Sequence, residues 1–432
     1  MNPSHSLALL LALAGMGSGV ARGADPTLLG TEDQQQLDRK TLEIVARPDF
    51  QDGVRRLEAM FRADPMAAKP EEAKTIRQDS DAIAYMALQW AVDSDPGRPK
   101  LMWMGEAPHR WFGMDIPWAS YGFQNQDDIY RQVAIDPTRR YEITGRRSAN
   151  PPVQARFGLF RSVIDEIPAG LQGDDIVTAP DGSFTITIDS DPANGRQNHI
   201  QSTPDTRLLV VRDVLSGWST QTPPMLAIRT VGGPPPAPSP SDDEMVHRSM
   251  DLASTMVRAW LGVYGPRIYK VAPNTIAQPF GRVGGWGYLT MSHFDLKHDQ
   301  ALIVTLDTAS AAYVGFELGD TWAVPLEFVH HTSSLTNGQT KPNRDGTITY
   351  VIAAKDPGVF NWLDAEGMPA GTFAIRWQRL AKAPIASAVV STEVVKLTEL
   401  KAHLPADTVW VTPGERKAQI EAREASWNRR LH

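Results

Sequence analysis

The chain has 432 residues, of which 42% are hydrophobic and 22% are charged, and it contains no cysteine. This length predicts two domains rather than one, and the lack of cysteine excludes disulfides, thiolate nucleophiles and cysteine-ligated zinc. The formal net charge of -7, without a dense run of basic residues, argues against a nucleic-acid partner, because a phosphate backbone requires a basic face.

The N-terminus has the pattern of a secretory signal peptide. The apolar run over residues 7–16 is too short to span a bilayer, and Ala21-Arg22-Gly23 fits a small-residue cleavage site. We therefore predict a signal peptide over residues 1–23 and a mature protein that is secreted or periplasmic. No later stretch approaches the roughly 18–20 apolar residues of a membrane helix, so we expect no membrane span after cleavage.

Residues 24–100 are predicted to form a helical N-terminal region. Thr31, followed by Gln34, fits a capping box ahead of an amphipathic run. Pro70 and the two glutamates after it fit the first turn of a further helix, where proline and acidic residues are both favoured. Apolar residues at helical spacing follow, between residues 83 and 90.

Two regions, residues 101–231 and 266–432, have the pattern of antiparallel sheets. Short runs rich in β-branched and aromatic residues, such as FTITID and ITYVIAA, are separated by turn residues. A Pro-rich linker and one helix, capped by Ser241, are predicted over residues 232–265. A charged helix that begins after Thr412 ends the chain.

The two β regions also resemble each other in the order of their strands and turns. The first contains Asp-Gly, FTITID, Asp-Pro and RLLVVRD, and the second contains Asp-Gly, ITYVIA, Asp-Pro and FAIRWQ, at an offset of about 160–165 residues. Chance similarity between ordinary strands is the alternative. We predict a mainly β fold, with two tandem, related antiparallel β-sandwiches, a helical N-terminal region, one linker helix and a C-terminal helix.

The candidate site centres on KDPGVFNWLDAEG, residues 355–367. Asp356 and Asp364 could act as acid and base in a glycoside hydrolase, because such enzymes place two carboxyl groups roughly 5–10 Å apart. Asn361 and Trp362 suit sugar recognition, since a flat ring stacks on sugar C–H groups while polar groups bind hydroxyls. The alternative is that both acids only form turns, as an Asp before Pro commonly does.

Four further residues extend this candidate site. His331 with an acid could form a general base, and Glu327 is a third carboxylate to consider. Arg376 could orient a substrate, and Trp322 could add an aromatic surface. A structural histidine and core tryptophans are the alternatives for these residue types. No spacing typical of metal ligands is present, so we predict neither a metal site nor a cofactor.

The chain resembles a bacterial family of unknown function, the domain of unknown function numbered twelve-fourteen. WAVPLEFVHHTSSLTN, DGTITYVIAAKDPGVFNWLDAEG and VVKLTELKAHLPADTVWVTPGERKAQI carry the resemblance, together with NQDDIYRQVAID and YEITGRR in the first half. The resemblance implies a jelly-roll-like β-sandwich in an exported or envelope-associated protein, and no established activity. The matching positions are Trp322, His331, Ser334, Leu335, Asp356, Pro357, Gly358, Asn361, Trp362, Asp364, Arg376 and Trp377.

Two functions stay open on this evidence. The first is a binding protein of the cell envelope, whose second sandwich recognises a glycan, a small molecule or another envelope component. The second is a hydrolase of extracellular carbohydrate that uses Asp356 and Asp364 as acid and base. We favour binding, because no complete catalytic set can be assembled from the sequence. The oligomeric state is not predicted.

Overall fold

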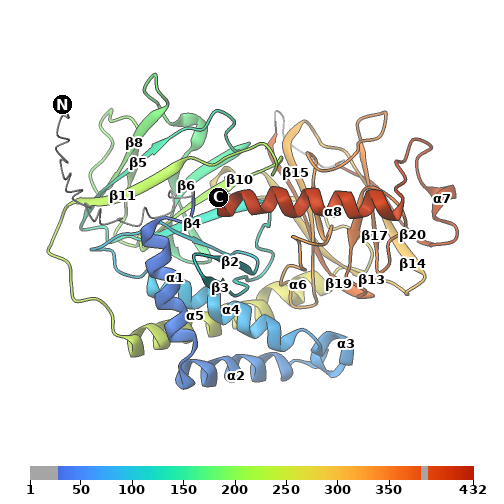
Figure 1. The fold of residues 1–432 in the computed structure, drawn as a ribbon, viewed down its shortest axis with the longest axis horizontal. Coiled ribbons are helices and arrows are strands. Elements are labelled where there is room, and N and C mark those ends of the chain that lie inside the picture. The colour runs from blue at the N-terminus through green and yellow to red at the C-terminus, as the bar shows by residue number, and fades with distance from the viewer. Residues whose placement is uncertain (1–27, 381–387) are drawn as a thin grey trace, which may run out of the picture.

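The computed structural model describes residues 28–380 and 388–432. Over these residues the protein is mainly β, with several antiparallel sheets and with helices at both the N-terminal and the C-terminal end, as predicted (Figure 1). The predicted signal peptide, residues 1–23, lies outside the described residues. Within the described ranges, no helix is long and apolar enough to cross a membrane.

The N-terminal helices begin close to the residues that the sequence predicts. The side chain of Thr31 accepts a hydrogen bond of 3.1 Å from the Gln34 backbone N–H. The run after Pro70 is divided into two helices, and the break places the Thr75 hydroxyl against Asp320 of the second β region. The four helices are α1 (Glu32–Val45), α2 (Pro48–Arg62), α3 (Pro70–Ala73) and α4 (Ile76–Val92).

The first β region forms a pair of sheets and a small hairpin. One sheet has the strand order β1-β4-β10-β6-β7 and the other β11-β5-β8-β9, in which only β8 and β9 are parallel. The strands are β1 (Met102–Met104), β2 (His109–Trp111), β3 (Met114–Ile116), β4 (Asp128–Ala134), β5 (Arg140–Arg146), β6 (Gln154–Ser162), β7 (Asp165–Gln172), β8 (Ser183–Asp189), β9 (His199–Gln201), β10 (Leu208–Val214) and β11 (Met225–Gly232).

The second β region forms another pair of sheets. Their strand orders are β12-β13-β19-β15-β16 and β18-β17-β14-β20, and only β17 and β18 are parallel. The strands are β12 (Phe280–Gly281), β13 (Tyr288–Asp295), β14 (Gln300–Leu306), β15 (Ala311–Gly319), β16 (Ser334–Thr336), β17 (Ile348–Ala353), β18 (Trp362–Asp364), β19 (Ala370–Leu380) and β20 (Val389–Lys396). Figure 1 shows this pair beside the first one.

Each pair of sheets encloses its own apolar core. Successive side chains of a strand point to opposite faces, so every second residue reaches the space between the two sheets. Leu209 and Val211 of β10 belong to the first core, and Phe373, Ile375 and Trp377 of β19 belong to the second.

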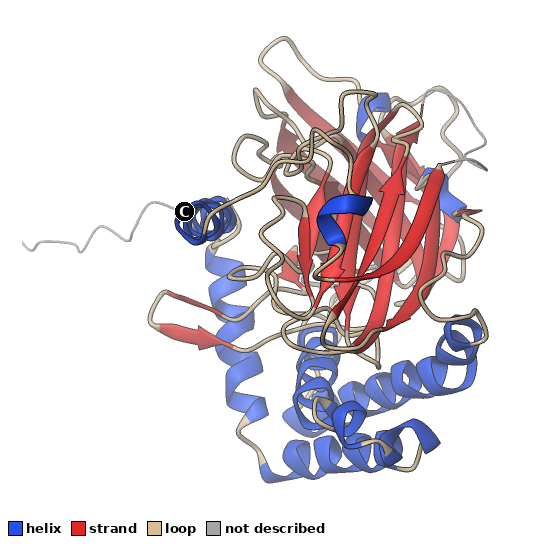
Figure 2. Ribbon diagram, turned by 90° about the vertical axis from the view of Figure 1, so that its right-hand side faces the viewer, coloured by secondary structure: helices blue, strands red, loops and turns tan. Residues whose placement is uncertain are grey.

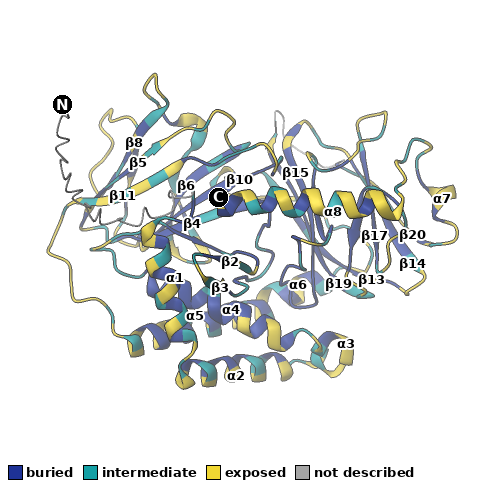
Figure 3. Cartoon of the chain, viewed as in Figure 1, coloured by how far each residue is buried: buried dark blue, intermediate teal, exposed yellow. Residues whose placement is uncertain are grey.

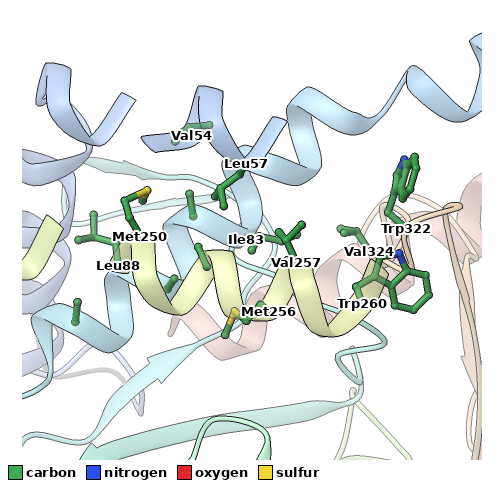
Figure 4. Packing of buried hydrophobic residues seen from close by; sticks show 14 of the residues in the cluster. Val54, Leu57, Ile83, Leu88, Met250, Met256, Val257, Trp260, Trp322 and Val324 are labelled. Carbon is green, nitrogen blue, oxygen red and sulfur yellow. The ribbon is translucent and has the colours of Figure 1, made fainter. Parts of the chain in front are cut away.

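The N-terminal helices, together with the helix after the Pro-rich linker, pack against residues on the outer faces of both five-stranded sheets. The chain returns to this layer through α5 (Asp242–Ala259), which Ser241 and Glu244 cap as predicted, and continues through a π-helical turn (Trp260–Tyr264) and α6 (Gly265–Tyr269). Figure 2 shows the helices gathered along one end of the sheets, and Figure 3 shows that α4 is largely buried there. Figure 4 shows part of the core that these helices share with the second β region, with these residues labelled: Val54, Leu57, Ile83, Leu88, Met250, Met256, Val257, Trp260, Trp322 and Val324.

The C-terminal helix, α8 (Pro413–Asn428), follows the short helix α7 (Leu400–His403) and runs across both pairs of sheets (Figure 1). Its capping box of Thr412 and Glu415 forms as the sequence predicts. Near its start Arg416 contacts the second β region, and just after its end Arg429 donates a hydrogen bond of 2.8 Å to the Trp218 carbonyl in the first. Helix α8 therefore links the two pairs.

Candidate functional site

The stretch 355–367 is a turn followed by β18, and its polar groups hold the chain in place. Asp356 accepts hydrogen bonds from the Gly358 backbone N–H at 2.8 Å and from Nε of Arg416 at 2.9 Å. Asn361 exchanges two hydrogen bonds of 2.8 Å with the Lys341 backbone and donates a third to the Thr349 carbonyl. These contacts favour the structural alternative for both residues.

The Trp362 ring is buried rather than open to solvent. Its Nε1 donates a hydrogen bond of 3.0 Å to the Ala353 carbonyl, and the Arg416 guanidinium lies 5.0 Å from the ring centroid. A sugar would need to displace Arg416 to stack on this ring. The arrangement is that of a core tryptophan with one face covered by a cation.

His331 and Asp364 are brought together. Nδ1 of His331 lies 2.7 Å from Oδ2 of Asp364, and this hydrogen bond raises the pKa of the imidazole above its usual value. The His331 side chain is 41% exposed, so solvent reaches it. Glu327, close enough to favour the charged imidazole, accepts hydrogen bonds from the backbone N–H groups of Val329 and His330 and so caps a turn.

The other two predicted residues lie inside the protein. Trp322 is buried against Phe61, and its Nε1 donates a hydrogen bond of 2.9 Å to the Glu72 carbonyl. Arg376 is buried on β19, where its guanidinium donates to Glu317 and to the Phe123 carbonyl. The structure thus joins His331 to Asp364 with Glu327 nearby, and it places Asp356, Trp322 and Arg376 in separate contacts.

Arg376 reaches a cavity that the sequence does not reveal. The cavity has a volume of about 410 Å³ and lies where the two five-stranded sheets meet helices α4 and α5. Most of its wall is apolar or aromatic, and part of that wall is Met86, Trp90, Met104, Met256, Trp260 and Met291. Its size and lining are those of a small-molecule site.

The alternation of the strands explains how arginines come to face this cavity. Leu209 and Val211 of β10 point into the first core. Val210 and Arg212 alternate with them along the strand and therefore point to the outer face of that sheet. Arg376 has the same relation to its neighbours on β19, which point into the second core. The helices bury both outer faces, and the two arginines are buried with them.

Two of the three cavity arginines have acidic partners. Arg212 contacts Asp128 at 2.8 Å and the Tyr130 hydroxyl at 3.2 Å, and its guanidinium lies 4.1 Å from the Trp286 ring centroid. Arg376 pairs with Glu317. Burial raises the pKa of Glu317, although the contact with Arg376 opposes this shift.

The third arginine, Arg282, has no such partner. It forms no ion pair with any described residue, and its Nη1 is buried without a hydrogen-bond partner. Burial, with repulsion from Arg212 and Arg376, lowers the pKa of Arg282 to about 9. The group is still charged at neutral pH, so the polar end of the cavity carries a positive charge that the protein does not neutralise.

Arg282 lies in a glycine-rich segment, residues 280–287, that consists of β12 and the loop after it. Gly284 has φ of 82°, a backbone conformation that strains other residues, and a Cβ at this position would also displace the Glu166 carboxylate, which would lie 2.4 Å away. The Glu166 carboxylate accepts a hydrogen bond of 2.9 Å from Trp286 Nε1, which ties the loop to the first β region.

Sequence reasoning proposed Arg376 and missed Arg212 and Arg282. One available signal was an arginine inside an apolar strand run, which occurs in both RLLVVRD and FAIRWQ. Another was the glycine-rich segment around Arg282. Neither signal shows that the three side chains meet. No group of three or more possible metal ligands is found among residues 28–380 and 388–432.

Comparison with known proteins gives a fold but no activity. No family model and no curated protein matches the chain. A solved structure of an uncharacterised protein from Burkholderia cenocepacia is similar, with a TM-score of 0.66, 23% identity, and coverage of 85% of this chain and 99% of that one. A protein from Vibrio parahaemolyticus gives a TM-score of 0.40 and 11% identity over 64% of this chain and 90% of its own.

Proposed function

We propose that the protein is a binding protein of the bacterial cell envelope, without catalytic turnover, and that its ligand lies in the 410 Å³ cavity between the two five-stranded sheets and the helices. The envelope location depends on the predicted signal peptide over residues 1–23. The binding site is supported mainly by Arg282, a partly buried arginine without an acidic partner among the described residues, whose buried Nη1 lacks a hydrogen-bond partner at one end of a mostly apolar cavity.

Matched positions in the two β regions support this site. In the first region Arg212 of β10 lies opposite Tyr130 of β4 in the strand register, and Tyr130 lies opposite Met104 of β1. In the second region Arg376 of β19 lies opposite Leu289 of β13, and Leu289 lies opposite Phe280 of β12. All six of these residues line the cavity. The cavity is therefore assembled from corresponding positions of the two five-stranded sheets.

The same correspondence supports the proposed duplication. Nine strands of each region, taken in chain order, occupy the same places in the two sheet orders, and each region has one parallel pair. Two related sandwiches, joined by residues 232–265, would produce this pattern. The resemblance to the twelve-fourteen family, and the jelly-roll-like architecture it implies, belong to this proposal.

The cavity is a better ligand site than the loop at residues 355–367. The polar groups of Asp356 and Asn361 are used in the loop itself, and the Trp362 ring is covered by Arg416. A glycan bound there would find few free donors or acceptors. The cavity, in contrast, offers both a large apolar surface and an unpartnered donor.

One observation favours hydrolysis as a second candidate function. The carboxylate of Asp364 holds Nδ1 of the partly exposed His331, which leaves its Nε2 to take a proton from water or a substrate. The version that uses two carboxylates is less well supported, because Asp356 is paired with Arg416. Turnover of a panel of chromogenic glycosides and esters that His331→Asn abolishes would establish this function.

The proposal is tested by a ligand screen on the mature protein from Ala24. Glycans, peptidoglycan fragments, lipids and small acids are added, and the unfolding temperature is measured. A ligand at about 100 times its dissociation constant stabilises the folded state by about 2.7 kcal/mol. We expect Met256→Trp, which fills the cavity, to abolish the shift and Asp364→Asn to preserve it. Shifts that survive Met256→Trp and disappear in Asp364→Asn would move the site to the loop.

A further inference from the structure

We infer that the cavity binds a single-chain amphiphile with one carboxylate, such as a fatty acid, and that Arg282 binds the carboxylate while the apolar wall holds the chain. This inference rests on the proposed function and names the chemical class of its ligand.

The charges around the cavity select a monoanion. Arg212 and Arg376 each touch an acidic side chain, Asp128 and Glu317, whereas Arg282 touches none among the described residues. A buried cation without a partner costs the folded protein free energy, and a ligand of opposite charge removes that cost. One uncompensated guanidinium matches one carboxylate, while a phosphate monoester would bring excess negative charge into the cavity.

The free hydrogen-bond donors fit a carboxylate. Nη1 of Arg282 and Nε of Arg376 are both buried and without an acceptor, and both residues line the cavity. A carboxylate has two oxygens that accept such hydrogen bonds, and charge-assisted bonds of this kind are the stronger ones in proteins.

The rest of the cavity suits an unbranched apolar chain. Four methionines lie in its wall, and their flexible thioether side chains adapt to the shape of a bound chain. Two polar groups nearby are engaged: the Tyr121 hydroxyl donates to the Met256 carbonyl at 3.0 Å, and the Gln124 amide donates to the Gly105 carbonyl at 2.7 Å. Gln124 Oε1 and Trp90 Nε1 are buried without a partner. These two atoms are few partners for the many hydroxyls of a sugar, and burying the remaining hydroxyls would cost free energy.

The cavity also has an apolar opening. Ile164 and Phe280 line it and are 45% and 47% exposed, although both are large and hydrophobic. Exposed apolar side chains at the edge of a cavity allow an alkyl chain to leave a membrane or micelle without crossing a polar rim. An apolar opening of this kind is expected at a binding site for an amphiphile, whereas it would not help a sugar to enter.

The test is isothermal titration of the mature protein with laurate and palmitate below their micelle concentrations. Dodecanol, dodecyltrimethylammonium and dodecyl phosphate serve as neutral, cationic and phosphate probes of similar chain length. We expect laurate to bind about ten- to hundredfold more tightly than dodecanol, and the cation not to bind, because the headgroup contact is a charge-assisted hydrogen bond.

Variants separate the headgroup from the chain. Arg282→Met is expected to lower laurate affinity about ten- to hundredfold, with Arg282→Lys intermediate, while the exposed Arg110→Met keeps the wild-type affinity. Without ligand, Arg282→Met should be at least as stable as the wild type, because it removes an unpaired buried charge. Loss of binding in that variant is then not loss of folding.

The outcomes distinguish this inference from the proposed function. If laurate and dodecanol bind equally and Met256→Trp abolishes both, the cavity remains the binding site but the inference of a carboxylate headgroup is wrong. Tighter binding of dodecyl phosphate than of laurate would show that the cavity does not select a headgroup with a single negative charge. Laurate binding that neither Arg282→Met nor Met256→Trp changes would overturn both proposals.

Discussion

The hydroxyl of Tyr313 donates a hydrogen bond of 2.7 Å to Oδ2 of Asp127, and this contact joins β15 of the second β region to the residue just before β4 of the first. Both groups are buried, and Asp127 also accepts a hydrogen bond of 2.9 Å from Trp218 Nε1. Burial raises the pKa of Asp127 to about 6, while the contact with Tyr313 acts against that shift. The pair helps to fix the two five-stranded sheets around the cavity.

Tyr313→Phe is expected to lower the free energy of unfolding by about 1–3 kcal/mol, because a buried carboxylate loses a donor. Denaturant unfolding at neutral pH measures the change. The matched control is Tyr350→Phe, whose hydroxyl is buried without a hydrogen-bond partner and whose removal should be neutral or slightly stabilising. Equal effects of the two substitutions would show that the contact with Asp127 does not stabilise the fold.

Arg416→Met is expected to cost about 2–4 kcal/mol of stability, because Arg416 is buried between Asp356, the Val359 carbonyl and the Trp362 ring. Asp356→Asn should cost less, since the Asp356 side chain is 35% exposed and water can replace the lost contact. Lys417→Met, at the exposed neighbouring position, should change stability by less than about 0.5 kcal/mol. If Arg416→Met is as mild as Lys417→Met, the loop is not held by α8.

The pH dependence of stability can be tested at Asp38. Burial raises its pKa to about 7, against hydrogen bonds from Gln34 and Trp111 that lower it. The folded state then binds a proton more tightly than the unfolded state. The contribution of Asp38 to the free energy of unfolding is therefore greatest below the unfolded pKa of 3.8, and it falls as the pH rises to about 7.

Asp38→Asn removes this titration. The difference in unfolding free energy between about pH 5 and about pH 8 should shrink by about 2–3 kcal/mol, since each unit of pKa is worth about 1.4 kcal/mol. Denaturant unfolding at both pH values provides the measurement, with the exposed Asp251→Asn as control. A pH slope that Asp38→Asn leaves unchanged would mean that Asp38 is ionised throughout this range.

The His331–Asp364 contact predicts an imidazole that titrates above its usual value of 6.5. Proton NMR titration should show that Asp364→Asn lowers the pKa of His331, because the accepting carboxylate is lost. Asp356→Asn should leave it unchanged, since Asp356 contacts Arg416 instead. An equal response to both substitutions would indicate that the two acids act on one site, as hydrolysis by a carboxylate pair requires.

The sequence by itself determined the features that depend on near neighbours. The helix starts at Ser241 and Thr412 each depend on a glutamate three positions later, so their capping boxes could be predicted. At Thr31 the helix start is as predicted, but only the Gln34 backbone N–H takes part, because the Gln34 side chain bonds Asp38 and the Trp103 carbonyl. The main strands could be predicted because short runs of β-branched and aromatic residues between turn residues favour an extended chain, which is also a local property. The break between α3 and α4 could not, because Thr75 there contacts Asp320 in a distant part of the chain.

Only the tertiary structure decided which polar residues meet. Asp356 and Asp364 share one short stretch, yet one binds Arg416 and the other His331, 60 and 33 residues away. Arg212, Arg282 and Arg376 lie on two strands and one loop that are far apart in the sequence, and packing of two sheets against the helices brings them to one cavity. The local sequence pattern determines which face of a strand or helix a side chain lies on. Long-range packing determines which other residues that face contacts.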